Sequence, residues 1–151
     1  MAAGTKHISK TKDIRPFLKA KGMRATSQRL AVHEAMLDLG HACADQVSEY
    51  IEQHGQTRIT TSSVYNILSQ FSDLGLYARR FTLDNRLLFD INTEAHLHLY
   101  DSRGHVVKDV YDSNLMEIVT SYARKHRFVG YKLDSVEIQL VCHPKRKRKK
   151  V

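Results

Sequence analysis

The sequence predicts an α+β fold in which a mostly helical N-terminal part precedes a small αβ domain. Two observations predict this class. Apolar residues recur with the helical period of 3.6 as far as Leu74, and from Leu76 the period changes to the value of 2 that is typical of strands. After Asn92 a second set of alternating strands and one helix follows. A single chain of 151 residues has room for one compact domain or two very small ones.

Four helices are expected in the N-terminal part, and each ends at or next to a glycine, the residue favoured just after a helix. Thr26 is a good N-cap for the second helix, because its hydroxyl can accept a bond from a free backbone N–H. The helices are expected from Asp13 to Gly22, from Thr26 to Gly40, over residues 44–54, and from Thr61 or Ser62 to Gly75.

A basic hairpin follows the fourth helix. Residues 76–81 and 86–91 read as two strands around the turn at 82–85. Helices followed by such a hairpin have the order of a winged helix-turn-helix, in which the last helix before the hairpin lies in the DNA major groove. Arg79 and Arg80 in the hairpin are therefore expected to contact the DNA backbone or minor groove.

The second unit is expected to contain strands at residues 96–101 and 105–110, a helix from Ser113, and a strand over 132–142. About 55 residues are marginal for independent folding. We therefore expect its apolar faces to be buried against another subunit, as a dimerisation domain. The predicted domains are a winged-helix DNA-binding domain at 1–91, a dimerisation domain at 92–144, and a basic disordered tail at 145–151.

The formal net charge of +8 is concentrated at the two ends of the chain. Residues 1–30 hold eight Lys or Arg and one acid, residues 145–150 are all basic, and the body between them is net acidic. A charge excess of this size suggests a polyanionic partner, such as nucleic acid or an anionic membrane surface. The longest apolar runs are far shorter than the roughly 20 residues of a membrane helix, so no membrane-spanning segment is expected. Of the two partners we predict nucleic acid and no membrane.

The N-terminus lacks the apolar stretch of a secretion signal. Cys43 and Cys142 are the two cysteines and form no CxxC motif, which argues against a disulfide scaffold. The expected setting is the reducing cytoplasm.

His96 and His98 are the most specific feature for chemistry. Residues at i and i+2 of a strand point to the same face, so both imidazoles can bind one metal ion. Asp90 and Asp109 end neighbouring strands, and His41 follows the end of the second helix. Three imidazoles and two carboxylates suit Fe²⁺, Mn²⁺ or Zn²⁺, and the lack of a thiolate disfavours Cu⁺.

An enzyme is the competing interpretation of this constellation. A mononuclear metalloenzyme would need a general base at a suitable spacing, and no such Glu or His is visible. We therefore predict a protein that is not an enzyme.

The chain resembles the ferric uptake regulator family of bacterial metal-dependent transcription factors, over about residues 14–142. The resemblance rests on the following segments, in this order: Gly22–Leu30 (GMRATSQRL), His41, Thr61–Leu68 (TSSVYNIL), Phe71-x-x-Leu74-Gly75-Leu76, Phe89-Asp90 and His96-x-His98. It implies a homodimer that binds double-stranded DNA at an AT-rich palindromic operator, with a regulatory metal held at the hinge between two domains.

The resemblance assigns the five hinge ligands to His41, Asp90, His96, His98 and Asp109. Closing the coordination sphere would fix the angle between the domains, and with it the spacing of the two recognition helices. The two aspartates resemble those of the peroxide-responsive repressors, in which site-bound Fe²⁺ reacts with hydrogen peroxide and a ligand histidine is oxidised, here His41 or His96. The alternative on the same scaffold is a regulator that responds to iron or manganese.

Two departures from the family concern other metal sites. Asp101 and Gly104 stand where the first CxxC pair of the structural zinc site is expected, and only Cys142 remains of the second pair. We therefore predict no structural Cys₄ zinc and one regulatory divalent metal per subunit, Fe²⁺ or Mn²⁺, with Zn²⁺ able to bind in purified protein. Leu97 and Ala95 replace a carboxylate and a histidine of the second regulatory site, so that site is expected to be degraded.

The resemblance also assigns residues to DNA contact. Tyr65 matches the base-contacting tyrosine of the recognition helix, and Arg24 matches the residue that reaches the minor groove. Ser62, Ser63 and Asn66 lie on the same part of the helix and can bond phosphates or bases. Tyr65 could instead be a core aromatic, but the apolar residues around it already fill the core face, so we expect it to be exposed.

Overall fold

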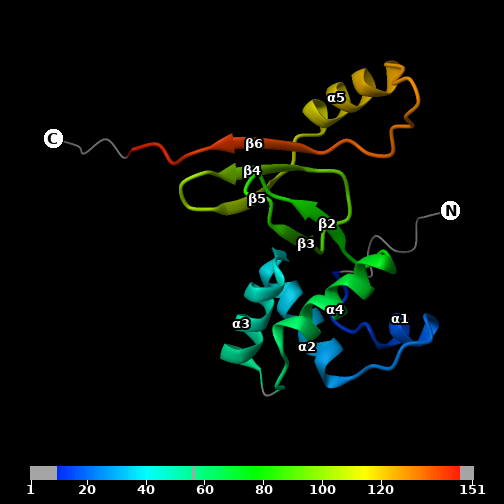
Figure 1. Cartoon of the computed structure of the whole chain (residues 1–151), viewed down its shortest axis with the longest axis vertical. Coiled ribbons are helices and arrows are strands. Elements are labelled where there is room, and N and C mark those ends of the chain that lie inside the picture. The colour runs from blue at the N-terminus through cyan, green and yellow to red at the C-terminus, as the bar shows by residue number, and fades with distance from the viewer. Residues whose placement is uncertain (1–9, 56, 147–151) are drawn as a thin grey trace. The chain divides into compact units, whose positions relative to one another are not determined.

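The computed structural model describes residues 10–55 and 57–146. These residues form two compact units that divide between Glu94 and Ala95. Each unit is described by itself (Figure 1). The basic tail that is predicted to be disordered spans residues 145–151, and residues 147–151 of it lie outside the described residues. Within the described part of the chain, no helix combines the length and the apolar composition needed to cross a bilayer.

Four helices make up most of the first unit, as the periodicity predicts. Thr26 and Thr60 occupy the N-cap positions of the second and fourth helices, and their hydroxyls accept the backbone N–H groups of Arg29 and Ser63. The bounds are α1, Arg15–Ala20; α2, Ser27–Leu39; α3, Ala44–His54; and α4, Thr61–Asp73.

The core of the first unit is formed by one apolar face from each helix. The largest fully buried side chains of these helices are Leu18, Met36, Ile51, Leu68 and Phe71. Burying a side chain of this size contributes about 1.5–3 kcal/mol, so the shared core is what fixes the helices against one another.

A small antiparallel sheet completes the first unit, with the strand order β1-β3-β2. Strands β2 (Ala78–Phe81) and β3 (Leu87–Asp90) form the predicted hairpin. Strand β1 (His41–Ala42) was not predicted, because two residues are too few to show a period of 2. It pairs with the end of β3 and brings His41 directly opposite Asp90.

The second unit contains a three-stranded sheet with the order β5-β4-β6. Strand β4 (Leu97–Asp101) is antiparallel to β5 (Val106–Val110) and parallel to β6 (Ile138–Cys142). Helix α5 (Ser113–Lys125) connects β5 to β6, and the side chain of Asp112 caps it by accepting the N–H of Leu115.

The last strand is shorter than the predicted 132–142. The first residue of β6, Ile138, pairs with the first residue of β4, Leu97. A parallel strand needs a partner for each backbone group, and β4 offers none before Leu97. Residues 132–137 therefore have no strand to pair with and remain irregular.

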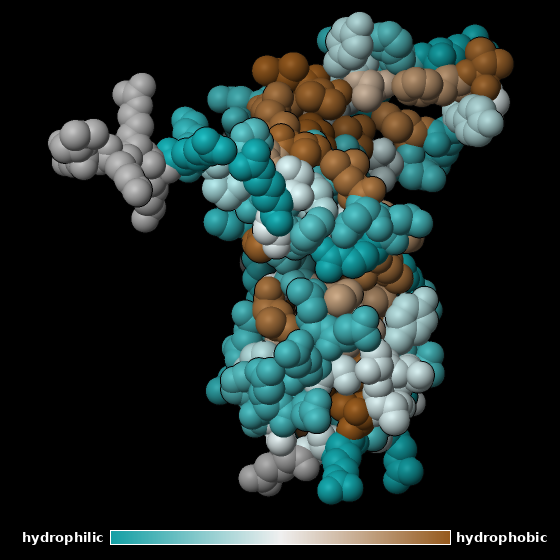
Figure 2. Space-filling view, turned by 60° about the vertical axis from the view of Figure 1, so that its left-hand side comes forward, coloured by the Kyte–Doolittle hydropathy of each residue, from teal (hydrophilic) through white to brown (hydrophobic). Residues whose placement is uncertain are grey.

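Apolar side chains are exposed on the second unit. Of the residues in α5, only Met116 is buried. The exposed apolar side chains of this unit include Tyr111, Ile118, Tyr122, Leu140 and Val141. Figure 2 shows hydrophobic residues gathered on the surface of this unit.

Candidate metal centre

His41 and Asp90 are neighbours on the small sheet of the first unit. They lie directly opposite each other in the β1–β3 ladder. Directly opposed residues of an antiparallel pair point to the same face, with Cβ atoms about 4.5–5.5 Å apart. An imidazole and a carboxylate are therefore presented side by side by the backbone of this unit alone.

Arg80 lies on the same face and contacts Asp90. Ala78 is the residue opposite Asp90, so Arg80, two residues further along β2, is a diagonal neighbour. Its Nε donates a hydrogen bond to Asp90 Oδ2 at 3.1 Å, and the two side chains are 16% and 1% exposed. The backbone N–H of Asn92 donates to the other oxygen, Oδ1, at 2.8 Å.

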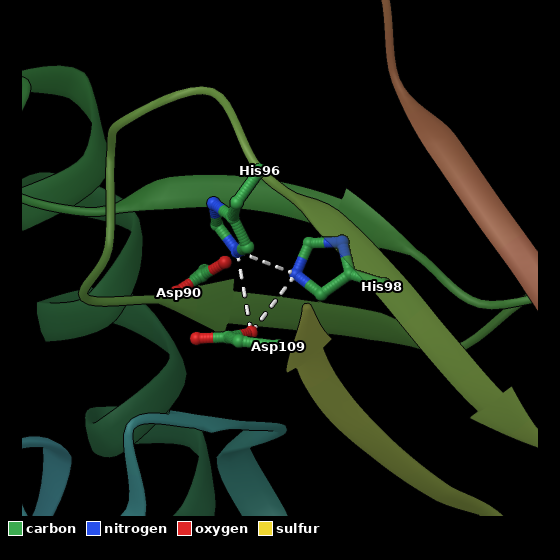
Figure 3. Close-up of side chains that lie close together, drawn as sticks. All are labelled: Asp90, His96, His98 and Asp109. Atoms are coloured by element: carbon green, nitrogen blue, oxygen red, sulfur yellow. Dashed lines mark hydrogen bonds and ion pairs between the residues drawn. The ribbon is translucent and has the colours of Figure 1, made fainter. Parts of the chain in front are cut away.

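Three potential metal ligands come together in the second unit. His98 lies directly opposite Asp109 in the β4–β5 ladder, and His96 precedes His98 by two residues, so all three side chains share one face. His96 Nε2 lies 2.9 Å from His98 Nε2 and 3.2 Å from Asp109 Oδ1, and His98 Nε2 lies 3.4 Å from the same oxygen. Figure 3 shows these three side chains and the triangle of interactions that joins them.

The size of this triangle fits the coordination of a divalent metal. Ligand atoms about 2.1 Å from one ion, at the angles of tetrahedral or octahedral coordination, are about 3.0–3.4 Å apart. The separations of 3.2 and 3.4 Å lie within this range, and the separation of 2.9 Å lies just below it. Two imidazole nitrogens and one carboxylate oxygen on one face also form the donor set of a 2-His-1-carboxylate site, which suits Fe²⁺ and leaves coordination positions open.

The surroundings of the triangle favour ligand binding. His96 and His98 are buried, and the side chain of Asp109 is 27% exposed. The ring of Tyr111 stacks near that of His96, with centroids 5.9 Å apart. Buried imidazoles that are held in place by packing lose little freedom when they bind an ion.

Each unit thus presents part of the predicted ligand set. His41 and Asp90 are neighbours in the first unit, and His96, His98 and Asp109 form the triangle in the second. These are the five residues that the sequence predicts.

Two residues next to these ligands, Tyr111 and Arg80, are not among the ligands or ligand neighbours that the sequence predicts. Tyr111 follows Asp109 by two residues, and this spacing is the signal in the sequence for a shared face. The charge of Arg80 predicts a DNA contact, and its diagonal contact with Asp90 becomes visible only in the register of β2 against β3.

The predicted DNA-contacting residues lie on and near α4. Tyr65 is 47% exposed, as expected, and the edge of its ring contacts Phe89 with centroids 6.1 Å apart. Ser62, Asn66 and Arg24 are exposed, and Ser63 is half-buried beside the N-cap Thr60.

Arg29 links the start of α2 to α4. Its guanidinium donates to the backbone carbonyl of Arg24 at 2.8 Å and to Gln70 Oε1 at 3.3 Å. These bonds join the segment that carries Arg24 to the helix that carries Tyr65, so the two predicted DNA contacts are connected.

The two arginines of the hairpin are bonded within the first unit. Arg79 donates to Asp73 Oδ1 at 2.9 Å and to the Ser69 carbonyl at 3.0 Å, at the C-terminal end of α4. Arg80 is bonded to Asp90 as described above. A DNA contact by either arginine would therefore have to share or replace these bonds.

The turn between β4 and β5 contains Asp101 and Gly104, which stand where the first CxxC pair of a structural zinc site is expected. Asp101 Oδ1 accepts the N–H groups of Gly104 and Arg103, and these bonds lower the pKa of the Asp101 carboxyl. The N–H and Oγ of Ser102 both donate to the carbonyl of Cys142, at 2.8 and 3.0 Å. Hydrogen bonds therefore connect this turn to the end of β6.

Comparison with known proteins identifies one family. The sequence model of the Ferric uptake regulator family matches residues 20–141. The peroxide-responsive repressor PerR of Staphylococcus epidermidis is 26% identical over 102 residues, which is 67% of each chain.

Solved structures share the fold. The ferric uptake regulator of Vibrio cholerae matches with a TM-score of 0.72 and 22% identity, over 87% of this chain and all of the other. The ferric uptake regulator of Pseudomonas aeruginosa, solved with manganese, matches with a TM-score of 0.65 and 21% identity, over 87% of this chain and 98% of the other. The α+β fold predicted from the sequence is confirmed by these matches.

Proposed function

The chain belongs to the ferric uptake regulator family, and from this premise we propose that it is a homodimeric DNA-binding repressor that a bound metal controls. Members of this family are metal-responsive transcriptional regulators rather than enzymes. The observation that carries the proposal is the triangle of His96, His98 and Asp109, whose 2.9–3.4 Å edges fit one divalent ion.

We propose that each subunit holds one regulatory metal, Fe²⁺ or Mn²⁺, with Zn²⁺ able to bind in the purified protein. The ligands are His41 and Asp90 from the first unit, and His96, His98 and Asp109 from the second. When bound, the metal would supply the positive charge for these carboxylates and imidazoles to coordinate. The predicted absence of a structural Cys₄ zinc is part of the proposal, and the hydrogen-bonded turn at Asp101–Gly104 supports it.

The location of the ligands supports a switch. His41 and Asp90 lie on the sheet that also contains the predicted wing, and the other three ligands belong to the second unit. Holding all five together would restrict the orientation of the DNA-binding domain relative to the dimerisation domain. A metal can act in this way only by binding the DNA-competent arrangement more tightly than the others.

Exposed apolar residues of the second unit support the homodimer. Ile118 and Tyr122 on α5 are 66% and 67% exposed, and Val141 at the end of β6 is 56% exposed. Contiguous apolar surface on a soluble protein marks an interaction site. A second copy of this chain would cover these residues.

The proposed operator is an AT-rich palindrome in double-stranded DNA, because a two-fold symmetric dimer reads two inverted half-sites. The proposed contacts are Tyr65, Ser62, Ser63 and Asn66 on α4, and Arg24 before α2. Arg79 and Arg80 are weaker candidates for DNA contact than these residues, because both are bonded within the first unit. A cytoplasmic location follows from this function.

We propose hydrogen peroxide as the signal, with Fe²⁺ as the site metal. In the net reaction peroxide transfers one oxygen atom to a ring carbon of His41 or His96 and leaves as water. The oxidised ring would be a poorer ligand, so the site would open. The similarity to a peroxide-responsive repressor supports this signal, and the alternative is a regulator that reports the availability of iron or manganese.

The experiment starts from a random-sequence duplex pool, because the operator is not assumed. Duplexes retained by Mn²⁺-loaded protein are selected and sequenced, and the affinity of the best one is measured by fluorescence anisotropy with Mn²⁺ and with a chelator. We expect tight binding with Mn²⁺ alone, and equal affinity in both conditions would exclude the switch.

The signal is tested separately with Fe²⁺-loaded protein. After peroxide treatment, peptide mapping should find the mass of one extra oxygen atom on His41 or His96, together with lost DNA affinity. Unmodified histidines with unchanged DNA affinity would contradict peroxide sensing and favour the alternative.

A further inference from the structure

We propose that Arg80 acts as a built-in cation on Asp90, and thereby sets how much metal is needed to fill the site. This inference rests on the proposed function, because it takes Asp90 as a ligand of the regulatory metal. It assigns to Arg80 a positioning role in the metal response instead of the DNA contact that its charge suggested.

Asp90 is buried within the first unit. Its side chain is 1% exposed, and a buried carboxylate is strongly destabilising unless a positive charge or several hydrogen bonds compensate it. Arg80 provides that compensation through the 3.1 Å bond from Nε to Oδ2. Arg80 therefore holds the Asp90 carboxylate in place in the metal-free protein.

The contact between Arg80 and Asp90 follows from the register of the sheet. The two residues are diagonal neighbours on β2 and β3, so strand pairing places the guanidinium beside the carboxylate. The Asn92 N–H fixes the second oxygen at 2.8 Å. The carboxylate is thus held from both sides by groups of the first unit.

A metal ion at Asp90 would add a second positive charge to the same carboxylate. The guanidinium and the divalent ion repel each other. The stabilisation that either one gives to the Asp90 carboxylate is therefore smaller when the other is present. Removal of Arg80 would take one positive charge away from Asp90 in both states, but in the metal-bound state the metal would still supply one. By linkage, metal affinity should then increase.

The decisive variant is Arg80→Gln in the full-length protein, with Arg80→Lys as the variant that keeps the charge. Mn²⁺ affinity is measured by titrating the Mn²⁺-loaded protein with a chelator, so a variant that is unstable without metal can still be measured. Thermal unfolding with and without Mn²⁺ is the second readout. Arg80→Met, which keeps the apolar stem, is measured alongside.

We expect Arg80→Gln and Arg80→Met to bind Mn²⁺ at least about tenfold more tightly, since loss of the guanidinium charge penalises the metal-free state more than the metal-bound state. Their melting temperatures should fall without Mn²⁺ and rise further than the wild type's when Mn²⁺ is added. Arg80→Lys should stay near the wild type in both measurements.

Asp90→Asn separates the two ways in which the reasoning can fail. If Asp90→Asn does not weaken Mn²⁺ binding, Asp90 is no ligand and the proposed site itself is wrong. If Asp90→Asn weakens binding while Arg80→Gln leaves it unchanged or weaker, the site stands and the role given to Arg80 is overturned.

Discussion

His33 offers a quantitative test of how the first unit is held together. It is 1% exposed in α2, with Nδ1 2.7 Å from the hydroxyl of Tyr77 and Nε2 2.8 Å from the carbonyl of Thr11. A carbonyl can only accept, so Nε2 donates to it, and in the neutral ring Nδ1 then accepts the tyrosine O–H. Burial favours this neutral ring: it lowers the pKa of His33, and it raises that of Tyr77 well above its ordinary value.

The change to make is His33→Leu, which keeps an apolar side chain in α2 but removes both partners. The buried Tyr77 hydroxyl then loses its acceptor, whereas the Thr11 carbonyl lies near the surface and can bind water. A buried polar group without a partner costs about 1–3 kcal/mol. We expect a loss of about 2 kcal/mol in the free energy of unfolding, or roughly 8–16 °C in melting temperature for a domain of this size.

The same residue predicts a pH dependence. The unfolded chain protonates His33 near its ordinary pKa of 6.5, whereas the folded protein does so only at lower pH. The stability due to the neutral ring is therefore complete above about pH 6.5 and is lost as the pH falls toward the folded-state pKa. His33→Leu should be less sensitive to acid than the wild type.

Urea unfolding at about pH 7.5 and about pH 5.5 measures both effects. His54→Leu is the matched control, because His54 is an exposed helical histidine at the end of α3. It should change the pH dependence little. Equal acid sensitivity of the wild type and His33→Leu would refute the reasoning about the buried ring.

Three further predictions concern DNA binding, assembly and the absence of structural zinc. Tyr65→Ala should lower affinity for the selected duplex by about 1–3 kcal/mol in fluorescence anisotropy, with unchanged thermal unfolding, and unchanged affinity would exclude Tyr65 as a base contact. Ile118→Asp should shift the protein from dimer to monomer in analytical ultracentrifugation, whereas Glu117→Asp should not; a dimeric Ile118→Asp would show that α5 is not the interface. Exhaustive chelation should leave the far-ultraviolet circular dichroism and the dimer intact, and more than one tightly held zinc per subunit would contradict the expected absence of a Cys₄ site.

Periodicity predicts the elements of this protein well where they are long and amphipathic. The four N-terminal helices and the hairpin are found where the apolar pattern predicts them. The exposure of Tyr65 could also be predicted, because the neighbouring apolar positions of α4 already fill the core. Strand β1 could not be predicted, since it is defined by its pairing with β3 and not by a pattern of its own.

Pairing between strands also limits what the sequence reveals about the site. The spacing of His96 and His98 alone predicts a shared face, and the structure brings their rings together with Asp109. The neighbourhood of Asp90 is different, because its contact with Arg80 depends on the register of β2 and β3. A one-residue shift in that register would have placed the arginine on the other face.

If one metal, held by His98 and its neighbours, controls DNA binding, then duplex binding must depend on the Mn²⁺ concentration, and a Mn²⁺ titration measures that dependence. Fluorescence anisotropy of the selected duplex is followed for the wild type, for His98→Ala, and for His126→Ala, which removes an exposed histidine at the end of α5. We expect Mn²⁺ to promote binding by the wild type and His126→Ala, and His98→Ala to need at least about tenfold more Mn²⁺. If all three proteins bound the duplex equally well without added metal, the account would be contradicted.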